Sequence, residues 1–262
     1  MALFSKKTNL KPMCLRDNKW VISVFGILMA GASCISFQYA MMSQEKIPFF
    51  YDIILDQTNG LLDICLIIPF AWLLVTGNPK SLFYGQSFKT IIVIKNVFAI
   101  NAICLFCFYV MNLIIYLWFS GFKNPFINYW TANNQMYRMG FGPINACLVS
   151  LLLLYIRMTF FTLVSLVINM MFNSEIYGFV GVLTLCLIDW GVYEWLKIYK
   201  PTGLLLVEHS RILYTTGYAP MIRTDVRISF GFTIFYWVSL YVVMIYLFIR
   251  FRGKNVEVLQ NE

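Results

Sequence analysis

A few side chains of this chain are of types that do chemistry, and their spacing decides which chemistry is open to them. Cys104 and Cys107 have the two-residue gap of redox and zinc motifs, but no second pair of ligands accompanies them. A structural zinc site needs about four ligands, and the chain has one histidine, His209. We therefore expect both cysteines to act as small apolar side chains. We expect His209 to be a hydrogen-bonding residue of a loop.

Arg157 and Asp189 are ionisable residues inside two long apolar stretches, 142–172 and 176–195. A charge in hydrocarbon is expensive, and by default it marks a function or a pair. Arg157 has about 13 residues before it in Ile144–Phe172, which is near mid-depth at a helical rise of about 1.5 Å per residue. Two interpretations stay open: Arg157 pairs with Asp189, or it lines an aqueous cavity that it reaches by snorkelling. We prefer both to a role in substrate binding.

The motifs of soluble catalysis do not occur in the sequence. It has no glycine-rich phosphate loop of the GxxxxGK[ST] kind, so the chain is not expected to hydrolyse ATP itself. It has no HExxH zinc motif either, and one histidine gives little material for acid–base catalysis. We therefore expect neither an enzyme nor a cofactor bound by this chain alone.

Apolar stretches recur along the whole chain and must position these residues. Runs of roughly 18 or more apolar residues can span a bilayer, and in lipid they must be helical. The composition agrees, because 60% of the residues are hydrophobic and only 12% are charged, against about 25% in soluble domains. We predict one all-α integral membrane domain, residues 1–262, with six transmembrane helices at 20–42, 61–77, 92–119, 142–172, 176–195 and 229–249. The first stretch is too long for a cleavable signal.

Basic residues flank both terminal stretches and predict the orientation. Positive residues are retained on the cytoplasmic side, so both ends are expected inside, although the predicted outer segment 197–229 is also basic. The net charge of +8 is typical of a membrane protein with basic cytoplasmic margins. The sequence has no basic patch interleaved with aromatic residues, so we do not expect nucleic-acid binding. The flanking residues are Lys6, Lys7, Lys11, Arg16 and Lys19 at one end, and Arg250, Arg252 and Lys254 at the other.

Two further segments have apolar residues but are too short to cross a bilayer. Residues 9–20 are either an interfacial helix or a basic flank that anchors the first span. Residues 201–229 contain short apolar runs cut by glycine and proline. They are either a re-entrant or interfacial helical segment, which is tolerated where protein covers it, or an aromatic-rich loop.

The connection between the second and third predicted spans carries the most specific motif. There, Gly85-Gln86-Ser87-Phe88-Lys89 resembles the Gly-x-Ser-Arg-Lys sequence of small membrane permeases of type-2 ABC exporters from Gram-positive bacteria, with Phe88 where arginine is usual. The layout of the whole chain is also similar to that family. The resemblance implies that this connection contacts the ATPase through Pro79, Lys80, Phe83, Tyr84, Gly85, Ser87, Phe88 and Lys89.

The same resemblance implies a function and a set of partners. The chain would be the transmembrane subunit of an ABC transporter in a bacterial cell membrane, paired with a second permease chain, identical or related. Separate ATPase subunits would bind ATP and Mg. The substrate would be amphipathic, such as an antimicrobial or toxic peptide, for export or for immunity. A non-transporting scaffold or bacteriocin-immunity protein remains the alternative, and an intramembrane enzyme is the third and weakest.

Overall fold

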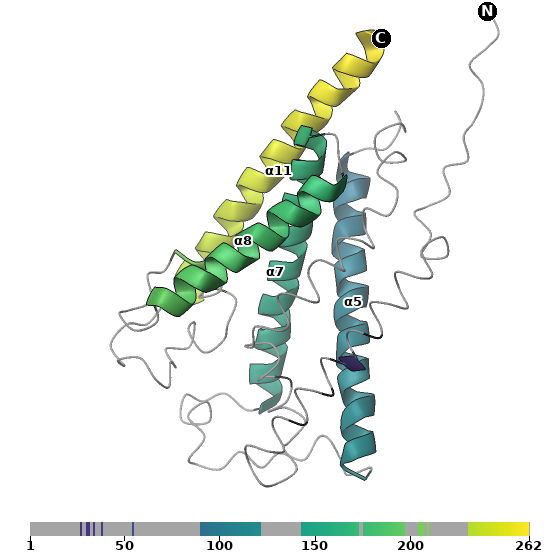
Figure 1. Ribbon diagram of the computed structural model, residues 1–262, viewed down its shortest axis with the longest axis vertical. Coiled ribbons are helices and arrows are strands. Elements are labelled where there is room, and N and C mark those ends of the chain that lie inside the picture. The colour runs from purple at the N-terminus through teal and green to yellow at the C-terminus, as the bar shows by residue number, and fades with distance from the viewer. Residues whose placement is uncertain are drawn as a thin grey trace, which may run out of the picture.

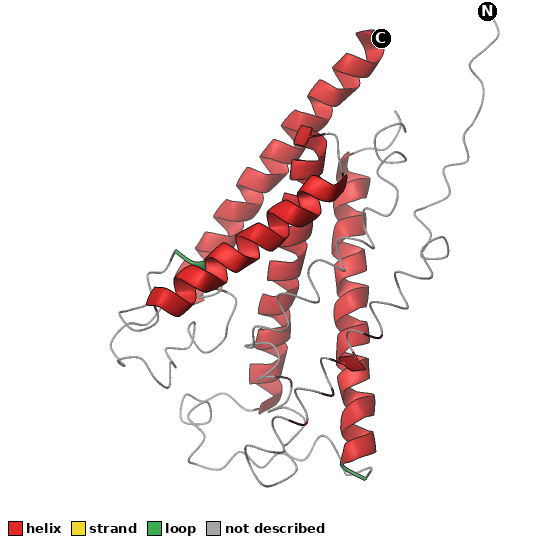
Figure 2. Ribbon diagram, viewed as in Figure 1, coloured by secondary structure: helices red, strands yellow, loops and turns green. Residues whose placement is uncertain are grey.

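The computed structural model is almost entirely helical in its described part, where only Ser120, Gly121, Leu204 and Leu205 lie outside helices (Figure 2). The described residues are 90–121, 143–172, 175–196, 204–206, 209 and 230–261, with Ile27, Ala30, Gly31, Cys34, Gln38 and Ile54. Four long helices succeed one another in this part (Figure 1). They are α5 (Thr90–Phe119), α7 (Pro143–Phe172), α8 (Glu175–Leu196) and α11 (Phe230–Asn261).

Three of these helices are long and apolar enough to cross a membrane. Their apolar parts are Val97–Phe119 in α5, Cys147–Phe172 in α7 and Gly231–Phe251 in α11. α8 has 22 residues, but its apolar stretch, Tyr177–Asp189, is shorter. Exposed aromatic side chains end two of the helices, Trp118 with Phe119 in α5 and Trp195 in α8, as is common at membrane interfaces. These features indicate a membrane protein.

The four helices coincide with four of the six predicted stretches. α7 and α8 are separated by two residues only, which confirms the short turn expected near residue 174. α11 differs, because the helix continues to Asn261 where the prediction ended at 249. The sequence after Phe251 contains no proline, and half of residues 252–261 are good helix formers, so nothing there forces the helix to end.

The other predictions of segments fall outside the described residues, wholly or in large part. In stretch 20–42 the described residues are helical, namely Ile27, Ala30, Gly31, Cys34 and Gln38. Stretch 61–77 and the interfacial segment 9–20 lie outside the described part. Of segment 201–229, the structure describes Leu204, Leu205, Leu206 and His209, with helical backbone at the last two.

The ends of α5 and α7 have local causes. The backbone N–H of Ser120 donates to the carbonyl of Tyr116 at 2.8 Å, and Gly121 comes next with a φ of 65°. That left-handed conformation is the usual helix stop, and it suits glycine because glycine has no Cβ. α7 begins at Pro143, where the missing N–H costs nothing because first-turn amides have no helical partner.

α7 is the central helix of the described bundle. It packs against α5, α8 and α11, and α8 crosses it obliquely (Figure 1). Within an 18-residue apolar segment of each helix, 72% of the residues of α7 are buried, against 24% in α5 and 17% in α11. α7 is therefore enclosed by protein, whereas α5 and α11 present most of their surface outward.

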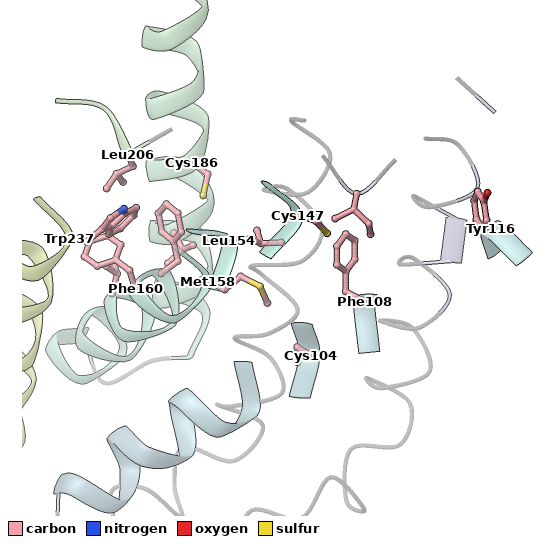
Figure 3. Packing of buried hydrophobic residues seen from close by; sticks show 14 residues of the cluster. Cys104, Phe108, Tyr116, Cys147, Leu154, Met158, Phe160, Cys186, Leu206 and Trp237 are labelled. Carbon is pink, nitrogen blue, oxygen red and sulfur yellow. The ribbon is translucent and has the colours of Figure 1, made fainter. Parts of the chain in front are cut away.

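The core gathers aromatic, aliphatic and sulfur-containing side chains around α7 (Figure 3). The Phe160 ring of α7 lies 5.6 Å from the Trp237 ring of α11, edge to face. Cys104 is buried in this core, and Cys107 is exposed on α5; both are free thiols. The expectation that they act as small apolar side chains stays a prediction.

Candidate functional site

Polar side chains are buried along the length of α7, inside the bundle. Polar groups within apolar helices must find partners in the protein, because lipid offers none. The buried polar residues of α7 are Ser150, Arg157, Thr159, Thr162, Ser165 and Asn169. This row is the candidate site, since intramembrane polar residues mark either helix contacts or function.

One contact in this row joins α7 to α5. The Asn101 amide nitrogen donates to the Thr162 hydroxyl oxygen at 3.2 Å, and it also donates to the carbonyl of Val97 at 2.8 Å. The Thr162 hydroxyl in turn donates to the carbonyl of Met158 at 2.8 Å. Asn101 and Thr162 are both fully buried, so this pair fixes α5 against α7 inside the membrane.

Two tyrosines tie three helices together through backbone carbonyls. The Tyr155 hydroxyl of α7 donates to the carbonyl of Phe98 in α5 at 3.0 Å. The Tyr241 hydroxyl of α11 donates to the carbonyl of Ile156 in α7 at 2.6 Å. These bonds satisfy the phenol groups while their rings remain in the apolar core. α5 and α11 are thus both anchored on adjacent residues of α7.

The last contact of the row joins α7 to α8. The backbone N–H of Gly178 donates to the side-chain oxygen of Asn169 at 2.8 Å. Gly178 lies in the first turn of α8, where backbone amides have no partner within the helix. Asn169 therefore caps α8 from the neighbouring helix.

Arg157 is buried as predicted, with 1% of its surface exposed. Within the described part of the chain, its Nε and Nη2 atoms have no hydrogen-bond acceptor. The Oδ1 atom of Asp189 accepts the backbone N–H of Leu206 at 2.9 Å. The pairing of Arg157 with Asp189 stays a prediction, and so does the lining of a cavity.

A second cluster lies between α8 and α11. We call it the clasp: it consists of Leu204, Leu206 and His209, with their partners Asp189, Thr233, Tyr236 and Trp237. His209 is completely buried. Its Nδ1 lies 3.0 Å from the Thr233 hydroxyl, and its carbonyl accepts the Trp237 indole N–H at 3.1 Å. These contacts confirm that His209 is a hydrogen-bonding residue, but its backbone is helical, so its expected place in a loop was wrong.

The aromatic residues of α11 complete the clasp. The His209 ring stacks on Tyr236 with centroids 4.0 Å apart, and the Tyr236 hydroxyl donates to the carbonyl of Leu204 at 2.8 Å. Sequence reasoning missed these partners. Their spacing held a signal, because Thr233 and Trp237 are four residues apart and so share one face of a helix.

Two apolar grooves flank the outer surface of α7. One has a volume of about 430 Å³ and lies between α7 and α11, where Tyr155, Trp237 and Tyr241 line it. The other has a volume of about 670 Å³ and lies between α5 and α7. Leu152 and Tyr155 belong to both grooves. Such surfaces suit apolar ligands or the apolar part of an amphipathic one.

The predicted ATPase-contacting residues, Pro79, Lys80, Phe83, Tyr84, Gly85, Ser87, Phe88 and Lys89, all lie outside the described residues. α5 begins at Thr90, the residue directly after Lys89. Comparison with family models, with curated proteins and with solved structures found no match.

Proposed function

We propose that this chain is the membrane subunit of an ATP-driven ABC-type exporter in a bacterial cell membrane, with six spans and both ends in the cytoplasm. The observation that carries the proposal is the junction at Thr90. The motif that resembles the family, Gly85 to Lys89, runs directly into α5, a helix of 30 residues whose apolar part can cross the membrane. A displacement of the motif would therefore be transmitted along one helix, α5, to the part of it that can cross the membrane.

The contacts of α5 supply a route for that movement. The Asn101–Thr162 pair and the Tyr155–Phe98 bond join α5 to the central helix, α7. A displacement of α5 would pass to α7, and from there to α8 and α11, which both pack on it. Closure of the partner ATPases on ATP and Mg would then shift the helices between inward and outward states.

The grooves on α7 support an amphipathic substrate, such as an antimicrobial or toxic peptide. Their lining is apolar, and they lie between helices that can span the membrane. An apolar side chain or tail would enter such a groove, while the polar part of the substrate stays in water or between two copies of the permease.

One observation favours the alternative, a membrane scaffold or bacteriocin-immunity protein without an ATPase. Thr162, Asn169 and Asp189 all make hydrogen bonds that hold the protein's own helices or segments together. Residues so engaged stabilise a fixed bundle and do not need to line a path.

Purification distinguishes the two functions. The tagged chain is extracted from native membranes in mild detergent, and co-eluting proteins are identified by mass spectrometry. The exporter predicts a stoichiometric soluble protein with a nucleotide-binding motif. Elution without such a protein, under conditions that preserve a known ABC complex from the same membranes, favours the scaffold.

A further inference from the structure

The clasp lies alongside the apolar stretch of α11 and not beyond its end. Its partners Thr233 and Trp237 belong to the apolar stretch of α11 that begins at Gly231. Trp237 comes six residues after Gly231, which is about 9 Å along the helix axis at a rise of about 1.5 Å per residue. The Trp237 indole N–H donates to the carbonyl of His209. The backbone at His209 must therefore lie at the depth of the apolar stretch of α11, past its first residue, Gly231.

The contacts of the clasp also satisfy backbone polar groups that would lack hydrogen-bond partners in hydrocarbon. The carbonyl of Leu204, the amide of Leu206 and the carbonyl of His209 are each bound by a side chain. Two of those side chains belong to α11, and the third, Asp189, belongs to α8. Backbone polar groups at membrane depth that have no partner within a helix are tolerated only where protein satisfies them in this way.

We propose that Leu204, Leu206 and His209 are a re-entrant element that enters the membrane between α8 and α11 and opens and closes as one unit. Its bonds reach both helices, so the clasp sets the distance between the end of α8 and the beginning of α11. The clasp needs no ATPase, so its test is independent of the proposed exporter function.

Opening as a unit is tested by hydrogen exchange of the full chain in lipid nanodiscs. Thr233→Val removes one hydroxyl on α11 at constant volume, and the readout is the Leu206 amide, which Asp189 of α8 binds. Loss of one net hydrogen bond should make this amide exchange roughly threefold to tenfold faster. Tyr236→Phe, a second variant that keeps its ring, should do the same. Thr184→Val is the matched control, because Thr184 is exposed on α8 away from the clasp.

A Leu206 amide that exchanges at the wild-type rate in both Thr233→Val and Tyr236→Phe would show that the contacts act separately, and would overturn the unit. The membrane depth is tested by a photoreactive benzoylphenylalanine in place of Leu204, which is exposed. Adducts with lipid acyl chains are expected, as for the same probe in place of Ile114, an exposed residue of α5. A probe at position 204 that yields no acyl-chain adducts while the probe at 114 does would overturn the re-entrant placement.

Discussion

The side-chain oxygen of Asn169 on α7 accepts the backbone N–H of Gly178 on α8 at 2.8 Å, and the two helices meet closely at this point. A Cβ atom on Gly178 would contact that same oxygen and would lie 2.5 Å from the backbone carbonyl oxygen of Ser165. The absence of a side chain at Gly178 is thus what lets its N–H approach Asn169 closely enough for this hydrogen bond. Small residues that allow close backbone approach are typical of helix pairs in membranes.

Gly178→Ala should therefore destabilise the bundle by about 1–3 kcal/mol, as overpacking does elsewhere. Gly181→Ala is the matched control, because its Cβ would meet only the side chain of Ile168, whose terminal methyl can rotate away. The measurement is the thermal unfolding midpoint of each purified variant in the same detergent. Equal midpoints for the two variants would contradict the tight contact at Gly178.

Asn101 and Thr162 should couple energetically across α5 and α7. Asn101→Ala, Thr162→Val and the double variant form a thermodynamic cycle read out by the free energy of unfolding. Interhelical hydrogen bonds in membranes average about 0.6 kcal/mol, so a coupling of about that size is expected. Strictly additive single-variant effects would mean that the Asn101–Thr162 contact contributes nothing.

Pairing of Arg157 with Asp189 can be tested in the same way. Arg157→Leu removes the buried positive charge, and Asp189→Asn removes the negative charge but keeps an acceptor for the Leu206 amide. If the two charges pair, each single change leaves a charge uncompensated, and the double variant should recover at least about 1 kcal/mol of the summed loss. Without any such recovery, cavity lining becomes the better explanation for Arg157.

Tyr84→Ala combined with Phe88→Ala should uncouple ATP hydrolysis from transport and leave insertion unchanged. Aromatic anchors carry much of the energy of protein interfaces, so ATPase binding should fall more than roughly tenfold. The control is Trp118→Ala with Phe119→Ala, an exposed aromatic pair at the opposite end of α5. Binding is measured by co-purification from membranes, and normal binding in the first variant removes the coupling role of residues 79–89.

The length of apolar runs was enough to predict the helices, because a bilayer leaves the backbone few alternatives. The predicted stretch 92–119 corresponds to α5 (Thr90–Phe119), and 142–172 corresponds to α7 (Pro143–Phe172). The end of α11 was not predictable in this way, since hydropathy reports where lipid ends and not where a helix ends. The charged sequence from Arg252 to Asn261 continues the helix beyond the apolar residues and contains no proline to end it.

The partners of the polar residues were less accessible to sequence reasoning. The hydrogen bond from the Leu206 amide to Asp189 was not predicted, because no side-chain pattern encodes a backbone partner. The same holds for Asn169, whose partner is the amide of a glycine. Charge and depth predicted that Arg157 is buried, but its neighbours depend on how α7 is surrounded.

Site-specific crosslinking at Tyr84 tests the exporter function most directly. A photoreactive benzoylphenylalanine replaces Tyr84 in the full chain, the native membranes are irradiated, and the adducts are identified by mass spectrometry. An ABC exporter subunit predicts a crosslink to a soluble protein that carries a nucleotide-binding motif. Adducts with lipid alone, in membranes where a known ABC permease crosslinks to its ATPase, would contradict that function.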